Sequence, residues 1–201
     1  MPTRRDVFPV GLRLEGRRCL VVGNGDGAEA RARALLEAGA RVLVVSEEPT
    51  PGLTALARAG SVELAHRSFQ DRDLDGVWLA VLTDRDAALA TRLGTLAEAQ
   101  RTFFCAIDQP QPSSFSHLAI AREGALTVAV STSGVAPALA RRLRQELQRV
   151  LSVAGIGAFT ERLAELRDRT PSADRARVLG QAVEDLKLGD IELPPDEKSA
   201  K

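Results

Sequence analysis

The sequence predicts an α/β protein: a Rossmann-type parallel-sheet domain, then a small hairpin-plus-helix region, then a C-terminal helical region. Three observations lead to this fold class. Short apolar runs alternate with helix-like stretches over about the first hundred residues, which is typical of parallel strands joined by helices. A glycine-rich turn directly follows the first apolar run. After Pro110 and Pro112 the pattern changes to two strand-like runs followed by helix-like stretches.

The first region begins with an apolar run at 18–22, which indicates a buried strand. Further strands are expected at 42–45, 62–65, 77–82 and 102–107, and helices at 28–38, 53–59 and 86–99. Gly39 and Gly60 end the first two helices, because glycine readily adopts the left-handed conformation found just after a helix. Residues 62–65 alternate between apolar and polar types, so this strand is expected near an edge of the sheet.

The second region starts with strand-like runs at 115–122 and 126–131, which Glu123-Gly124 joins into a predicted hairpin. Helices are expected at 137–151, about 158–169 and 173–188. The expected divisions are a Rossmann-type domain at 1–112, a hairpin and helix at 113–150, a helical region at 151–188 and a disordered tail at 189–201.

Composition excludes several classes of partner. Lys plus Arg and Asp plus Glu are 27 each, and aromatic residues make up only 3%, which argues against a nucleic-acid partner. No apolar run approaches the roughly 20 residues of a membrane span, and the first residues lack the apolar core of a secretory signal. A cytoplasmic protein without a membrane partner is therefore expected. Cys19 and Cys105 are expected to be buried and unpaired.

The glycine turn Gly23-Asn24-Gly25-Asp26-Gly27-Ala28 fits the G-x-G-x-x-G/A pattern, between an expected strand and an expected helix. In such a turn Gly23 makes the bend, Gly25 lets the backbone approach a pyrophosphate, and Ala28 permits close packing of helix on strand. The N–H groups at the helix start then face the phosphates. The alternative interpretation is a glycine turn that only shapes a loop.

An acidic residue, Glu47 or Glu48, follows the second expected strand. A carboxylate at this position hydrogen-bonds the adenosine ribose hydroxyls and repels a 2′-phosphate, which favours NAD over NADP. Thr83 and Asp84 follow the strand at 77–82 and are further candidates for cofactor contacts.

Asp108 follows a fully apolar strand and is the candidate catalytic residue. Ligands of open α/β sheets collect beyond the carboxyl ends of the strands, where a carboxylate can take the proton lost as hydride leaves. Strand-end aspartates also close Asx turns, and spacing alone leaves the two interpretations open.

The stretch Ser131-Thr132-Ser133-Gly134 leads into a helix that carries Arg141, Arg142 and Arg144. Hydroxyls and free N–H groups at a helix start bind anions, so this stretch and Arg141 are candidates for a substrate with several carboxylates. Ordinary helix capping with a solvated basic face is the alternative. His66 and His117 are interpreted as surface or packing residues.

Four stretches resemble the precorrin-2 dehydrogenase / sirohydrochlorin ferrochelatase family, which includes the N-terminal module of siroheme synthase. They are Phe8-Pro9-Val10 with Leu12 and Leu14, CLVVGNGDGAEARARALLEAGARVLVVS at 19–46, FFCAIDQPQPSSF at 103–115, and LTVAVSTSGVAPALARRLRQEL at 126–147. The last resembles the family's S-T-x-G signature before its dimerisation helix. Only residues 151–201 follow, so the resemblance is to the stand-alone form without a methyltransferase module.

The resemblance implies NAD-dependent oxidation of precorrin-2, a tetrapyrrole carrying eight carboxylates, to sirohydrochlorin. Some members also insert Fe²⁺ to give siroheme. It implies a catalytic role for Asp108 in both steps, a homodimer held by the segment 113–150, and iron as a transient substrate for which Asp108 and His117 are the candidate contacts. No stable metal site is expected.

The chain departs from the family pattern at several positions. Asn24 replaces a glycine, Gly27 stands where Val is common, Ala30 replaces part of an Arg-Lys pair, and Leu118 stands where Pro is frequent. Thr132 occupies the position of a serine linked to regulation. These departures leave substrate contacts open. Two rival functions remain: a regulatory module that senses NAD without catalysis, and an NAD oxidoreductase for another polycarboxylate.

Overall fold

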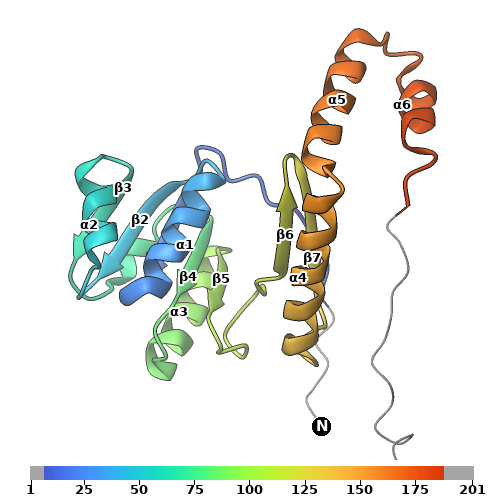
Figure 1. The fold of residues 1–201 in the computed structure, drawn as a ribbon. Helices are drawn as coiled ribbons and strands as arrows, with labels where there is room; N and C mark the ends of the chain where they lie inside the picture. The colour runs from blue at the N-terminus through green and yellow to red at the C-terminus, as the bar shows by residue number, and fades with distance from the viewer. Residues whose placement is uncertain (1–6, 188–201) are drawn as a thin grey trace, which may run out of the picture. The chain divides into compact units, whose positions relative to one another are not determined.

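The computed structural model describes residues 7–187, which fall into two compact units (Figure 1). One unit spans Asp6–His117, and the other contains all described residues from Leu118 onward. Residue 188 and the tail at 189–201, expected from the sequence to be disordered, lie outside the described residues.

The sheet unit is built on five parallel strands in the order β3-β2-β1-β4-β5, so β3 is an edge strand as predicted. The strands are β1 (Arg18–Val22), β2 (Arg41–Ser46), β3 (Val62–His66), β4 (Leu79–Leu82) and β5 (Phe103–Ala106). In the central pair, Leu20 of β1 lies opposite Leu43 of β2 and Ala80 of β4. The predicted fold class and all five predicted strands are present.

Apolar layers cover both faces of this sheet because successive strand side chains point to opposite sides. On one face α1 (Gly25–Glu37) and α2 (Pro51–Arg58) pack on Cys19 and Val21. On the other face α3 (Ala87–Gln100) and the 3₁₀ helix η1 (Asp71–Leu74) pack on Leu20 and Val22. The sequence pattern does not predict η1, which is too short to show a helical period. Both cysteines are buried and unpaired, as expected.

Several element boundaries differ from the prediction by a few residues, and two of these differences have clear reasons. Helix α1 starts at Gly25, three residues before the predicted 28–38, because the glycines of the turn give no apolar period although they already form its first helical turn. Strand β4 starts at Leu79, since the N–H of Val77 donates to the carbonyl of Leu74 (3.0 Å) and closes the turn after η1.

Residues 115–117, predicted as the start of a hairpin strand, and the preceding Ser113 and Ser114 belong to the sheet unit and form no strand. The Ser114 hydroxyl accepts from the N–H of Phe104 (2.9 Å), and the Ser113 hydroxyl accepts from that of Ala106 (3.0 Å). These two side chains therefore occupy hydrogen-bonding positions along β5 that a sixth strand would otherwise fill.

The second unit contains the predicted hairpin and three helices. Strands β6 (Ala119–Glu123) and β7 (Leu126–Val130) pair antiparallel around Gly124, whose φ is +57°. The helices are α4 (Pro137–Val153), α5 (Ile156–Arg169) and α6 (Arg175–Val183), the last being shorter than the predicted 173–188. Among the described residues, no helix is long and apolar enough to span a membrane.

Candidate functional site

A pocket of about 370 Å³ opens at the carboxyl ends of the central strands of the sheet unit. In open parallel sheets this edge is where ligands bind. Its lining comes from the β1 and β2 ends (Gly23, Ser46 and Glu47), from the β3–η1 segment (Arg67, Ser68 and Phe69), and from β4 onward (Asp84, Asp86 and Arg92).

The glycine turn has a distinct structural requirement at each of its key positions. A Cβ at Gly23, whose φ is +137°, would collide with the Thr83 hydroxyl and the Asp84 carboxylate. Gly25 has φ +68°, and a Cβ there would meet nothing within 4 Å, so its backbone face is open. Ala28 is fully buried on the sheet. Gly25, Asp26 and Gly27 form the exposed first turn of α1.

Asn24 connects the ends of three strands. Its backbone N–H and its amide Nδ2 donate to the two carboxylate oxygens of Asp84, at 2.9 and 2.8 Å. Its Oδ1 accepts from the Ser46 hydroxyl and from the Glu48 N–H, both at 2.8 Å. Its side chain makes no hydrogen bond to α1, although Asn24 is the N-cap residue of that helix. The first-turn N–H groups of α1 are therefore not capped by this side chain.

The two candidate acidic residues differ in their surroundings. Glu47 lines the pocket, and its Oε1 accepts from the Ser68 hydroxyl at 2.8 Å. Its carbonyl oxygen lies 2.8 Å from Nε2 of His66. Glu48 is exposed and enters the network through its backbone N–H. Only Glu47 of the pair has its carboxylate at the pocket wall.

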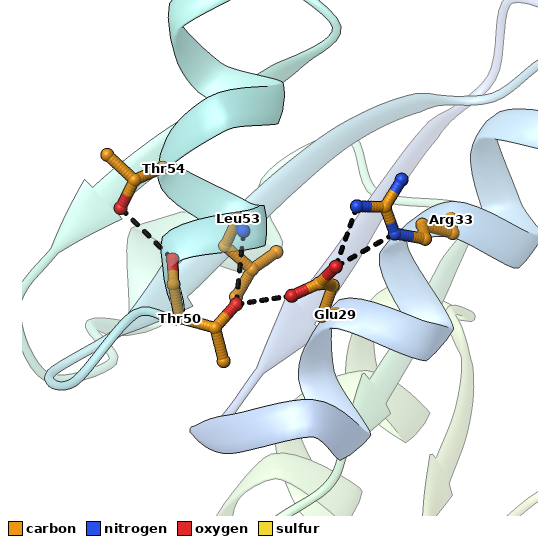
Figure 2. A network of polar contacts seen from close by, with 5 residues as sticks. All are labelled: Glu29, Arg33, Thr50, Leu53 and Thr54. Atoms are coloured by element: carbon orange, nitrogen blue, oxygen red, sulfur yellow. Dashed lines mark hydrogen bonds and ion pairs between the residues drawn. The ribbon is translucent and has the colours of Figure 1, made fainter.

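A second network attaches the end of the loop between β2 and α2, which contains Glu47 and Glu48, to α1 (Figure 2). The Thr50 hydroxyl donates to Glu29 Oε2 (2.5 Å) and accepts from the N–H of Leu53 (3.1 Å), which caps α2. Arg33 donates to Oε1 of Glu29. Hydrogen bonds first from Thr50 and then from Arg33 lower the pKa of Glu29 below its ordinary value. Glu29 had no motif in the sequence to mark it.

Asp108 lies just beyond β5, at the same edge of the sheet as Asp84. It is exposed and has φ +58°, a left-handed conformation that Asp tolerates better than most residues. Its Oδ2 accepts from Arg85 Nη2 at 2.8 Å. The neighbouring Gln109 donates from Nε2 to the Asp84 carbonyl (3.1 Å), so the β4 and β5 ends are directly linked. The sequence interpretation did not single out Arg85, although it follows the candidate Asp84.

The candidate substrate residues lie in the second unit. The Ser131 hydroxyl accepts from the N–H of Ser133 (3.1 Å), and the Thr132 hydroxyl accepts from that of Ala136 (3.2 Å). Gly134 has φ +77°, and Ser133 is also left-handed at +51°. The two hydroxyls thus order their own loop, neither of them caps α4, and each can still donate its proton to an anion. Arg141 is exposed on α4.

His117 ends the sheet unit and packs edge-on against Phe115, with ring centroids 5.2 Å apart. Desolvation, followed by the positive charge of Arg31, lowers the pKa of His117 to about 4, so its imidazole is neutral at pH 7. Within residues 7–187 no group of three or more His, Cys, Asp or Glu side chains could hold a metal ion.

Comparison with known proteins assigns the chain to a family. Residues 10–119 match the family described as "Putative NAD(P)-binding", and residues 123–149 match the central region of sirohaem biosynthesis proteins. Siroheme synthases of Escherichia coli strains K12 / DH10B and SMS-3-5 / SECEC are each 40% identical over 164 residues, or 82% of this chain. The chain belongs to the family described as "Putative NAD(P)-binding", and its following segment matches the central region of sirohaem biosynthesis proteins.

The family relatives are longer than this chain, which spans 36% of the siroheme synthases that it matches. A solved structure described as "SirC, precorrin-2 dehydrogenase" superposes with a TM-score of 0.75 at 22% identity, covering 89% of this chain and 90% of the other. This likeness confirms the predicted fold, from the sheet to the C-terminal helices. The family resemblance read from the four sequence stretches is likewise confirmed.

Proposed function

We propose that this chain oxidises precorrin-2 to sirohydrochlorin with NAD⁺ as the hydride acceptor. One observation carries the proposal: an open glycine turn, a pocket-lining carboxylate and Asp108 lie along one edge of the sheet in a member of this family. The siroheme synthase relatives and the precorrin-2 dehydrogenase of matching fold point to the same substrate.

The residues present fit a dinucleotide. The open backbone face at Gly25 and the first-turn N–H groups of Asp26, Gly27 and Ala28 suit a pyrophosphate. Glu47 at the pocket wall suits the adenosine ribose, where its carboxylate would disfavour the 2′-phosphate of NADP. Thr83 and Asp84 complete the wall behind the turn. Bound NAD⁺ supplies the chemistry of a two-electron acceptor that takes up hydride.

Asp108 is proposed to receive the proton that the substrate loses. Oxidation removes one hydride and one proton from precorrin-2, and the hydride leaves with the cofactor. The proton needs an acceptor at the crevice edge, and the exposed carboxylate of Asp108 lies there. Its ion pair with Arg85 must open when Asp108 takes the proton, and the guanidinium is then available to a substrate carboxylate.

The second unit is proposed to bind substrate carboxylates and to form a homodimer. Ser131, Thr132, Ser133, Gly134 and Arg141 supply hydroxyl, N–H and guanidinium donors for the former role. For the latter, the core of the unit's described part is small: it consists of Ala121, Leu151 and Ile156, and Ala140 of α4 is also buried. The unit leaves Leu139 51% and Val153 81% exposed on α4. A two-stranded sheet with so little core is stabilised by a partner surface.

Iron insertion into sirohydrochlorin is a second activity of the same proposal. Iron would be a substrate, and the neutral imidazole of His117 and the carboxylate of Asp108 are its candidate contacts.

The test is an anaerobic assay of the purified protein with precorrin-2 and NAD⁺, following NADH absorbance and the sirohydrochlorin spectrum. Fe²⁺ is added afterwards to test chelation. NADH formation coupled to the spectral change supports the proposal. NAD⁺ binding without turnover would instead favour a regulatory module that senses NAD. Turnover only with a different polycarboxylate would favour an NAD oxidoreductase for that substrate.

Dimerisation has its own measurement. Sedimentation equilibrium should give a dimer, and Leu139→Glu on the exposed α4 face should shift it to monomer, whereas Ala164→Glu on the exposed side of α5 should not. A monomeric wild-type protein would rule the dimer out.

A further inference from the structure

Asn24 is the N-cap residue of α1, yet its side chain does not cap the helix. Its φ of −120° and ψ of 167° are those of an N-cap, and Asn is among the residue types preferred there. Such an asparagine normally accepts from an N–H of the first turn. Here the amide is directed away from α1 and bonds the ends of β2 and β4 instead.

The chemistry of its partners fixes the orientation of this amide. Asp84 as a carboxylate can only accept, so it must face Nδ2 of Asn24. The N–H of Glu48 can only donate, so it must face Oδ1, which the Ser46 hydroxyl also approaches. A flipped amide would lose the bonds to both Asp84 and Glu48. Asn24 is partly buried, which strengthens the preference for one orientation.

The loop after β2 is consequently fastened to α1 at both of its ends. Asn24 bonds Ser46, the last residue of β2, and Glu48 in the loop, while Glu29 on the second turn of α1 bonds Thr50 at the end of the loop (Figure 2). Glu47 lies between these two attachments, and Ser68 holds its carboxylate. The proposed ribose contact is thus ordered before any ligand arrives, and a preformed contact loses less entropy on binding.

We infer that Asn24 is a positioning residue that sets both the affinity for NAD and the preference for NAD over NADP. Its diverted amide leaves the first-turn N–H groups of α1 to the pyrophosphate and holds Glu47 where a 2′-phosphate would meet its charge. This inference rests on the proposed function, since it concerns how the same site holds its cofactor. It also explains the departure from the family's glycine at this position.

The test compares Asn24→Gly and Ser46→Ala with the wild type by calorimetric titration of NAD⁺ and NADP⁺. Thr95→Ala is the matched control, since that hydroxyl bonds only its own helix (Thr91 carbonyl, 3.1 Å). Asn24→Gly should weaken NAD⁺ binding about tenfold and NADP⁺ binding only about twofold. The effect on NADP⁺ is smaller because a less ordered Glu47 also repels the 2′-phosphate less. Ser46→Ala removes one of the three hydrogen bonds of the Asn24 side chain and should weaken NAD⁺ binding about threefold.

Equal weakening of both dinucleotides in Asn24→Gly would show a merely structural role and overturn the inference, as would unchanged affinities. If Asn24→Gly does not fold, by circular dichroism and thermal unfolding, Ser46→Ala decides by the same criterion. A wild-type protein that binds neither dinucleotide would overturn the proposed function itself, a result distinct from wild-type binding with insensitive variants.

Discussion

The two units differ in the size of the apolar core that each one buries. The sheet unit has a closed apolar layer on each face of its sheet, and Leu20, Leu82, Leu93 and Phe104 are essentially inaccessible. The second unit has a core of three small or medium residues and exposes Val135 and Leu139 on or beside α4. The difference agrees with the proposal that the second unit packs against a partner surface, whereas the sheet unit has a large core of its own.

The polar networks of the two units hold different features in place. At the carboxyl edge of the sheet unit, Asn24, Asp84 and Gln109 join side chains from strand ends far apart in the sequence, and Asp84 also lines the pocket. In the second unit, Gln148 of α4 bonds the backbone of Arg122 on β6 and so joins the helix to the hairpin. The network of the sheet unit lies at the edge where ligands of parallel sheets bind, which favours this unit as the place of the proposed reaction.

The largest expected effect tests whether the proposed chemistry depends on Asp108 of the sheet unit. Asp108→Asn keeps the size of the side chain and removes its basicity, so kcat for precorrin-2 oxidation should fall by about 10² to 10⁴. The affinity for NAD⁺ and the sedimentation behaviour should not change. Anaerobic steady-state kinetics measure the first, and calorimetry and sedimentation the others. Retained turnover would move the proton acceptor elsewhere, whereas loss of NAD⁺ binding would show that Asp108 supports the cofactor site.

Matched core truncations should separate the stabilities of the units. Leu20→Ala removes a fully buried side chain between two apolar layers, so unfolding free energy should fall by about 3–4 kcal/mol. Leu151→Ala should cost only about 2 kcal/mol, because its smaller surroundings collapse more readily. Amide hydrogen exchange of β1 measures the stability of the sheet unit, and that of β6 measures the stability of the second unit. Equal losses would contradict the proposed difference.

Acid should weaken the sheet unit first. Of the described residues, Asp73 is the one buried carboxylate, and it accepts from Arg67 at 2.7 and 2.8 Å and from the N–H of Gln70 at 2.8 Å. Burial alone would raise the pKa of Asp73, but the hydrogen bonds from Arg67 and Gln70, together with the positive charges of Arg67 and Arg72, outweigh it and lower the pKa.

Because the pKa of Asp73 is lower in the folded than in the unfolded protein, its carboxylate stabilises the fold at pH values above the unfolded-state pKa. This stabilisation is lost as the pH falls below about 4. Asp73→Asn should therefore cost about 1–3 kcal/mol at pH 7 and progressively less below about pH 4. Urea denaturation across this range, with Asp71→Asn on the exposed side of η1 as control, measures it. A pH-independent difference would show that protonation of Asp73 is not involved.

How far the sequence predicts this molecule depends on how local each signal is. The limits of β1, the hairpin turn at Glu123-Gly124 and the glycine turn follow from neighbouring residues, and all were predicted. The position of Asp108 at the crevice edge also follows, because parallel strands end at one edge.

The contacts that decide the site are not local. The bonds from Asn24 to Asp84 join residues 60 positions apart, and that from Arg85 to Asp108 spans 23. An asparagine at the start of a helix predicts a cap, and only the neighbouring strand ends redirect it. Likewise the sequence left Glu47 and Glu48 equivalent, and the pocket wall distinguishes them.

The smallest expected effect tests an ion pair at the edge that carries the chemistry. Arg85 and Asp108 lie 2.8 Å apart, but their side chains are 79% and 63% exposed. Exposed pairs contribute little because water and salt screen them, so Arg85→Ala should change the unfolding free energy by less than about 1 kcal/mol.

Activity should respond differently from stability. If Arg85 passes from Asp108 to a substrate carboxylate, Arg85→Ala should raise KM for precorrin-2 about three- to tenfold at low salt, with kcat changed less than about twofold. Arg169→Ala, which removes an exposed pair with Glu165 on α5, is the matched control and should leave KM for precorrin-2 unchanged. An unchanged KM in Arg85→Ala would mean that the guanidinium only neutralises Asp108 in the free protein. The hydrogen-bond donors to the substrate carboxylates would then have to come from the second unit alone.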